Sequence, residues 1–451
     1  MRALLLVFLV SPLACVGDSG TPDSGTDAAA DSGSDSPADV TTEASADSVD
    51  GVVIDTFFAP RQGAKVSIGG VIATTDAQGK FSIKPVPTTP YDVWVADVDA
   101  TVQHEIIGFI GLTTRTPTLQ STWAGTFRQS GAVTGQLTGA TFPGVSSQGV
   151  AVWWDSPRSY HYATGSVGAD KIPAGGAWDA ANVTGTWFGD TNEAGNVYAL
   201  VYSVSNGITG FSGVGNVTAA LTAAQAKSGL SLPLTNPSSK HDTGNLNLSG
   251  LTATSNAVYI HADTSRSALF LETIPANNGA IDILVPDAPN VTTTLSATAH
   301  DSQNDTSTVW KARMAPGALF GTIVMPTPIA ASSPADNASN VDATTSYTWS
   351  KAAGTVVYHL GVICGTNPAP FALDVITTST SAQLPVAKTL SDLGVVFPTG
   401  TQCLWTASSI APANTIDDFA TAAGWSDKVT DYTASADGSR TTTAQRKFTT
   451  P

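Results

Sequence analysis

The chain is poor in charge, in cysteine and in long apolar runs. Only 12% of its 451 residues are charged, and 20 Lys and Arg stand against 36 Asp and Glu. Nucleic-acid binding requires a basic surface that this chain lacks, so we expect no nucleic-acid partner. Beyond the N-terminal segment, no stretch is long and apolar enough to span a membrane as a helix.

The motifs of common enzyme classes are also missing. There is no His-Glu-x-x-His, no Gly-x-Ser-x-Gly, no phosphate-binding loop and no dinucleotide fingerprint, and none of the six histidines has metal-ligand spacing. Residues 17–20 read GDSG, as around the serine of trypsin-like proteases, but every histidine follows them and the segment cannot build an oxyanion hole. We therefore predict no enzyme, no catalytic residue, no metal and no cofactor; a hydrolase with a divergent site is the alternative.

What the chain does contain favours β-structure. Gly, Thr, Ser, Ala and Val are abundant, while Lys, Glu and Leu are sparse, and this composition suits short strands joined by tight turns. A length of 451 residues predicts three or four domains. We expect an all-β protein made of tandem antiparallel β-sandwich modules, Ig-like or transthyretin-like.

The N-terminus has the features of an export signal. Arg2 is followed by the apolar run ALLLVFLV at 3–10, which is too short to span a bilayer, and small residues then lead to Cys15. The Leu-Ala-Cys ending resembles the lipobox of bacterial lipoproteins, although Pro12 departs from it. The resemblance implies that 1–15 are signal and lipobox and that Cys15 carries a lipid held in a membrane. Val16 after the cysteine implies the outer membrane. A plain secretory signal is the alternative.

An acidic, low-complexity segment follows at 16–50. It holds nine carboxylates and no Lys, Arg or aromatic residue. Such a segment buries too little apolar surface to offset the entropy of ordering, so we expect a disordered linker. A flexible coil of this length averages roughly 30–35 Å end to end, which suits a tether between a membrane and folded modules. A calcium-binding tract is the alternative interpretation.

The residues after the linker predict a first sandwich over 51–128. Short alternating strands are interrupted by TTDAQGKFSI at 74–83, where Asp76 and Gly79 are typical of a tight turn. The succession resembles the carboxypeptidase regulatory-like family, a transthyretin-like β-sandwich that has no peptidase chemistry of its own. Similar but weaker patterns predict two more sandwich modules, over 129–238 and 239–328, with one short helix at 219–227.

The last segment, 329–451, resembles bacterial fibronectin type III-like domains. It opens SPADNASNV at 333–341, continues to SYTWS at 346–350 and closes on KFTT at 447–450. The resemblance leaves an insertion near 411–440 unexplained. In that fold Cys364 and Cys403 lie on neighbouring antiparallel strands, which implies a disulfide in an exported protein. Two free thiols are the alternative.

Aromatic residues concentrate in the second predicted module. Trp153 and Trp154 are adjacent in an expected strand, so their side chains face opposite sides of the sheet and cannot both lie in one sandwich core. An exposed aromatic platform would bind a polysaccharide or a protein; alternatively, one Trp is core and the other is covered by the loop 155–180. The candidate ligand-binding residues are Trp153, Trp154, Tyr160, Tyr162, Trp178 and Trp187.

A second candidate is the acidic run HDSQND at 300–305. Its carboxylate and amide oxygens, on Asp301, Asn304 and Asp305, predict either a calcium site or an Asx-rich hairpin turn. Taken together, these features predict an exported, envelope-attached lipoprotein that is a structural or adhesive array of β-sandwich modules. The alternative is an accessory protein that binds an envelope polysaccharide or a protein partner through the aromatic residues of the second module.

Overall fold

The computed structural model describes residues 47–451 except 56–58, 100–102, 122–127, 140–147, 157–165, 169–175, 179–182, 189–190, 263–268, 276, 290, 355, 366–370 and 422–435. The described residues form 33 strands, one α-helix of seven residues and one 3-10 helix. The prediction of an all-β protein with several packed sheets is confirmed. Within this part of the chain, neither helix has the length and apolar character that crossing a membrane requires.

The first module packs two sheets face to face. Its strands are β1 (Val49–Ile54), β2 (Lys65–Ile68), β3 (Val71–Thr74), β4 (Lys80–Ile83), β5 (Tyr91–Asp99), β6 (Gln103–Leu112) and β7 (Thr118–Gln120). Strands β4, β1 and β7 form one sheet, and β3, β2, β5 and β6 belong to the other. The predicted turn before β4 is present: Asp76 Oδ1 accepts hydrogen bonds from the N–H groups of Gln78 and Lys80, and Gly79 has a φ of 70°.

The second module has a longer set of strands. They are β8 (Arg128–Thr138), β9 (Gln148–Asp155), β10 (Ser166–Gly168), β11 (Ala177–Trp178), β12 (Thr184–Phe188), β13 (Asn192–Glu193), β14 (Asn196–Val204), β15 (Ile208–Thr218), β16 (Leu221–Thr222) and β17 (Ala226–Pro233). The helix predicted over 219–227 is wrong. Ala224 turns the chain with a φ of 57° and donates its N–H to Ser130 of β8, so pairing with a neighbouring strand overrides the helical preference of alanine.

The third module repeats the plan of the first two. Its strands are β18 (Ser238–Asn247), β19 (Thr252–Ala262), β20 (Leu269–Ile274), β21 (Gly279–Asp287), β22 (Val291–His300), β23 (Thr306–Met314) and β24 (Leu319–Val324). In all three modules the first strand runs parallel to the last and antiparallel to a strand on its other side, as β1, β8 and β18 show. The facing sheet also keeps one order, β3-β2-β5-β6, β10-β9-β14-β15 and β20-β19-β22-β23. The three modules therefore share a topology.

The fourth module has a different strand order. Its elements are β25 (Ala331–Ser333), β26 (Ala338–Ser339), β27 (Tyr347–Trp349), β28 (Val357–Cys364), β29 (Phe371–Thr377), β30 (Ser381–Ala382), α1 (Ala387–Leu393), β31 (Gln402–Ala411), η2 (Ile416–Phe419), β32 (Gly438–Thr442) and β33 (Arg446–Thr449). Strands β25, β27 and β30 form one sheet, which faces β29, β28, β31 and β33. Tyr347 fills the core between them, with its ring centroid 5.5 Å from that of Trp405 and 6.0 Å from that of Phe448.

A disulfide joins two neighbouring strands of this module. Cys364 at the end of β28 is the register partner of Cys403 near the start of β31, and their sulfur atoms are 2.00 Å apart. Both cysteines are buried. The predicted pairing is confirmed.

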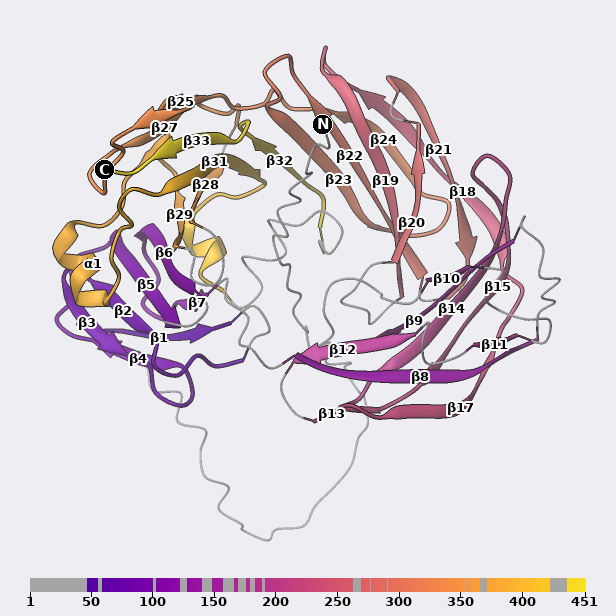
Figure 1. Ribbon diagram of the computed structural model, residues 1–451. Coiled ribbons are helices and arrows are strands. Elements are labelled where there is room, and N and C mark those ends of the chain that lie inside the picture. The colour runs from indigo at the N-terminus through magenta and orange to yellow at the C-terminus, as the bar shows by residue number, and fades with distance from the viewer. Residues whose placement is uncertain are drawn as a thin grey trace, which may run out of the picture.

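One sheet of 14 strands runs through the first, fourth and third modules. Strand β6 of the first module pairs in parallel with β29 of the fourth. At the other side of the fourth module, β31 pairs with β32, and β32 pairs with β23 of the third. The modules therefore follow an arc in the order first, fourth, third, second (Figure 1), and not the order of the chain.

Described residues of the insertion at 411–440 contact both modules that neighbour the fourth. Ile416 and Phe419 of η2 are buried in the core of the first module, and Asp417 accepts hydrogen bonds from the N–H groups of Thr113 and Thr114 in that module. The same segment ends in β32, the strand that connects the fourth module to the third. The described parts of this segment, around η2 and at β32, thus lie at contacts between modules.

Candidate functional site

The central strands of the second module are buried on both faces. On β9, Val152 and Trp154 point into the core between the two sheets of the module, whereas Ala151 and Trp153 belong to a core cluster shared with strands of the third module. The third module therefore covers the outer face of this sheet. Trp153 and Trp154 face opposite sides as predicted, and both are buried, with 4% and 3% of their surfaces exposed.

Trp154 and Trp187 are core residues of the second module. The indole N–H of Trp154 donates to the carbonyl oxygen of Ala219 at 2.8 Å, and its ring lies 5.6 Å from that of Trp187, which has no exposed surface. A Cβ on Gly185 would lie 2.4 Å from the ring of Trp154, so glycine makes room for the indole there. Neither ring offers a surface to a ligand.

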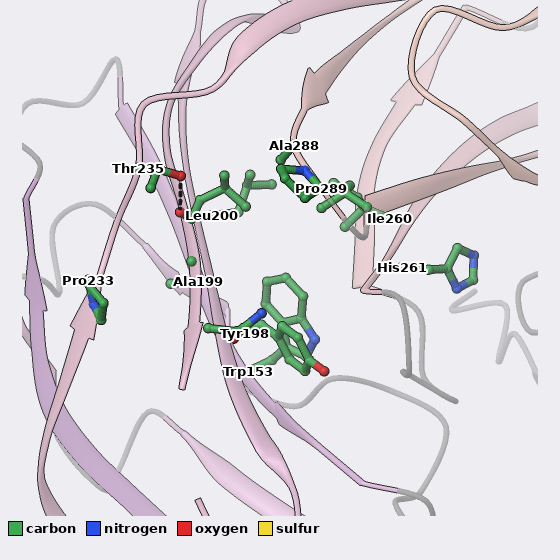
Figure 2. Close-up of a pocket in the computed structure, with 14 residues that line it drawn as sticks. Trp153, Tyr198, Ala199, Leu200, Pro233, Thr235, Ile260, His261, Ala288 and Pro289 are labelled. Carbon is green, nitrogen blue, oxygen red and sulfur yellow. Dashed lines mark hydrogen bonds between the residues drawn. The ribbon is translucent and has the colours of Figure 1, made fainter. Parts of the chain in front are cut away.

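Trp153 instead lines a cavity between the second and third modules. The cavity has a volume of about 280 Å³. The ring of Trp153 stacks on that of Tyr198, its register partner on β14, with centroids 5.4 Å apart. Ile260 of β19 and Pro289, which follows β21, form the opposite wall (Figure 2).

Trp153 also carries an unsatisfied polar atom. The indole Nε1 of Trp153 is buried and has no hydrogen-bond partner. His261 also contributes to the lining, but its ring is directed away from Trp153 and Tyr198 (Figure 2), and its Nε2 lies 2.8 Å from Thr294 Oγ1. Among the described residues of the lining there is no carboxylate, lysine or arginine. The cavity thus offers largely apolar walls and an aromatic pair, with Asn216 and Thr235 as polar side chains.

The junction beside this cavity holds a partly buried carboxylate. Glu272 of β20 in the third module accepts a hydrogen bond at 3.1 Å from the N–H of Ile208 in the second. Burial raises the pKa of Glu272 above its ordinary value, and the hydrogen bond from Ile208 opposes this only in part. Burial also raises the pKa of the Tyr202 phenol on the facing strand. The junction is therefore dry enough to disfavour charge.

The remaining candidate residues are placed as follows. Cys15, Tyr160 and Tyr162 lie outside the described residues. For Trp178 only the strand position is described, as the partner of Gly135 on β8. Trp153, Trp154 and Trp187 are buried and do not form an exposed aromatic platform. Ligand binding by the candidate residues stays a prediction. The sequence analysis missed Tyr198. The signal was its position on strand β14, where Tyr198 and Leu200 point to one face and Val197 and Ala199 to the other.

The acidic turn between β22 and β23 binds backbone groups. Asp301 Oδ1 accepts hydrogen bonds from the N–H groups of Gln303 and Asp305 at 2.8 and 3.0 Å. Asp305 Oδ1 accepts one from Ala444, and Asn304 has a φ of 65°. Within the described part of the chain, no group of three or more His, Cys, Asp or Glu side chains is placed to hold a metal. The geometry is that of an Asx-rich hairpin turn.

Comparison with solved structures gives likenesses to several chains. A fimbrial assembly protein from Parabacteroides distasonis is 11% identical over 41% of this chain and 95% of its own, with a TM-score of 0.16. A similarity that low carries no argument about fold or function. No family model matches the chain, and no curated protein matches it.

Proposed function

We propose that this protein is a non-enzymatic lipoprotein of the cell envelope, in which β-sandwich modules form a structural or adhesive array. The observation that supports this most is the 14-stranded sheet, because hydrogen-bonded strands connect three modules that flexible linkers could otherwise have joined. A sheet shared between modules resists bending at their joints. A rigid array of modules is suited to a structural or adhesive role, because it keeps its binding surfaces in a fixed relative position.

We propose that the first module is a transthyretin-like sandwich of the carboxypeptidase regulatory-like kind. The topology that it shares with the second and third modules supports extending this proposal to them. The fourth is proposed to be fibronectin type III-like with an added strand, β32. Cys15 with its lipid and the acidic linker attach this body to the outer membrane. The linker predicted over 16–50 ends earlier than expected, because Val49 and Asp50 already belong to strand β1. The membrane is thus the proposed partner at one end, and an envelope polysaccharide or protein is the partner of the array.

Fractionation of cells that express the full chain tests the attachment. We expect the wild-type protein in the envelope fraction and Cys15→Ala in the soluble exported fraction, because the substitution removes the only residue that takes the lipid. The double variant Cys364→Ala with Cys403→Ala is the control for loss of cysteine and stays with the envelope. Retention of Cys15→Ala in the envelope would contradict the proposal.

A second candidate function is supported by the unpaired indole N–H of Trp153. A buried donor without a partner costs free energy, on the order of 1–3 kcal/mol, that a ligand with a hydrogen-bond acceptor would recover. In this alternative the protein is an accessory binder, and the cavity of about 280 Å³ takes one sugar ring or one side chain of a partner. Trp153→Phe keeps an aromatic ring and removes the donor. Binding of purified full-length protein to isolated envelopes should weaken in this variant if the cavity is used, and stay unchanged if it is not.

A further inference from the structure

A groove of about 660 Å³ lies where the first and fourth modules meet. One wall is the outer face of the β3-β2-β5-β6 sheet, and the other comes from β30 and the segment that leads into α1. Its volume falls within the range of ligand sites, about 300–1,000 Å³. The groove exists only because β6 and β29 are paired, since that pairing brings the two walls together.

Trp94 supplies an aromatic surface in this groove. It is half-buried on β5, and its register partner on β6 is Gly108. A Cβ at Gly108 would lie 2.4 Å from the Trp94 ring, so the ring lies directly over the glycine backbone. The side chain also packs against the core of the fourth module. Trp94 therefore lies between the two modules and is one of the residues that line the groove.

The rest of the lining is rich in hydroxyl groups. Ser379 and Ser381 lie at the start of β30, with their Oγ atoms 3.2 Å apart, and Gln383 follows them. Four further hydroxyl side chains complete the set, namely Ser67, Ser346, Thr377 and Thr389. Hydroxyl and carboxamide groups both donate and accept hydrogen bonds, which suits a ligand whose own groups do the same.

Asp92 is the one charged residue among the described residues that line the groove. Its Oδ1 accepts a hydrogen bond from the N–H of Gly111 at 3.0 Å, which fixes the carboxylate beside Trp94 on the same face of β5. Burial raises its pKa, as expected for a carboxylate that is partly removed from water. No lysine or arginine is among the part of the lining that the structure describes. An anionic ligand would there meet the negative charge of Asp92 without compensation.

We propose that this groove binds a neutral saccharide chain. The apolar face of a sugar ring stacks on Trp94, as aromatic side chains do with flat apolar surfaces. The sugar hydroxyls then donate to Asp92 and exchange hydrogen bonds with Ser379, Ser381 and Gln383. The volume of about 660 Å³ is large enough for a short oligosaccharide. This site is separate from the cavity at Trp153 and does not depend on attachment to a membrane.

The test uses the purified full-length chain and calorimetric titration with defined neutral tetrasaccharides: cellotetraose, maltotetraose, mannotetraose and chitotetraose. Tetragalacturonic acid is the anionic comparison. We expect binding of at least one neutral tetrasaccharide and none of the anionic one. Failure of all four neutral ligands to bind a folded protein, or binding of the anionic one alone, would overturn the proposal.

Variants locate the binding. Trp94→Ala and Asp92→Asn should each weaken it at least tenfold, whereas Ser228→Ala, at an exposed serine of the second module, should leave it unchanged. Because loss of Trp94 uncovers Gly108 and can unfold the junction, Ser379→Leu provides a second approach: it fills the groove from an exposed position and should abolish binding while the protein stays folded. Unchanged affinity in Ser379→Leu would also overturn the proposal.

Discussion

Phe419 and Ile416 belong to the fourth module in sequence but to the first module in space. Both are buried among residues of β1 to β7, and Phe419 has no exposed surface. Their neighbours include Phe109 and Leu112, about 300 positions earlier in the chain. Each of these side chains therefore contributes to two things at once, the core of the first module and its junction with the fourth.

Replacing Phe419 with alanine should destabilise the first module. Loss of a fully buried Phe costs roughly 3–5 kcal/mol, because transfer and cavity terms add. Hydrogen exchange should show faster opening of β1, β5 and β6, while the second module is unaffected. Val396→Ala, at a side chain that is 80% exposed, is the control and should change stability by less than about 0.5 kcal/mol. Equal exchange in both variants would show that Phe419 is not part of that core.

Glu272→Gln should stabilise the junction between the second and third modules at neutral pH. Because burial raises the pKa of Glu272 above its ordinary 4.5, the folded state disfavours the ionised form. That penalty is present above the folded pKa and is lost as pH falls toward 4.5, so this group stabilises the fold as the solution becomes acidic. Glutamine keeps an oxygen for the N–H of Ile208.

Thermal melts at two pH values check this expectation. The melting temperature of Glu272→Gln should exceed that of the wild type at pH 7, and the difference should vanish below pH 4.5, the ordinary value for Glu. Glu43→Gln in the predicted linker is the matched control and should show no difference at either pH. A constant difference across the whole range would mean that charge is not the cause.

The sequence pattern predicts which face of a sheet a side chain points to, but it does not predict which residues pack against that face. Alternation along β9 is enough to place Trp153 and Trp154 on opposite faces. What covers Trp153 comes from another module, and no local pattern of the strand encodes that cover. The same limit applies to the groove at Trp94, whose second wall is about 290 residues away in the chain.

Strand β31, which has ten residues, pairs with three other strands. Its first half pairs with β33 and its second half with β32, while β28 runs along its other side. The disulfide fixes the start of this strand to the end of β28. The strand is thus held at both ends, once by a covalent bond and once by the pairing that leads to the third module.

Removal of the disulfide should weaken the fourth module. Cys364 and Cys403 are 39 positions apart, and closing a loop of that length contributes about 4 kcal/mol in the chain-entropy model. The double alanine variant should therefore unfold at clearly lower denaturant concentration than the wild type. Reduced wild type serves as the control, because it loses the bond but keeps both sulfur atoms, and it should match the variant. No loss in either would contradict the expectation.

Strands were more accessible to sequence reasoning than their connections. The turn at Asp76, β1 and the disulfide strands follow from local alternation and turn chemistry. The helix predicted at 219–227 fails because its alanines continue into strand pairing with β8, a contact between distant segments. The shared topology of the first three modules depends on parallel pairing of first and last strands, which no local signal reports.

The arc of modules departs most from the sequence. A chain of modules in a row would place the first beside the second, yet the first lies beside the fourth (Figure 1). The core of the first module includes Val357, Ile376 and Ile410 as well as the inserted segment. The first module is therefore incomplete without the last.

A chain that ends at residue 328 tests this dependence. It keeps every strand of the first three modules but lacks the residues that complete the core of the first. We expect proteases to cut the first module of this shortened chain under conditions that leave the full-length protein intact. The second module is the internal control, because its core contains no residue of the fourth and it should resist cleavage in both proteins. Equal resistance of the first module in both would show that it folds alone.

Pairing between β6 and β29 also has a consequence for export. If the chain is exported as proposed, its first module leaves the membrane well before the residues near 420 that complete the core of that module. A chain that stops early would keep apolar surface and an open strand edge on its leading part. Exposed apolar surface and unpaired strand edges make an incompletely folded chain prone to aggregate. In the proposed exported state, proteases and chaperones of the envelope would act on an unfinished chain at its first module.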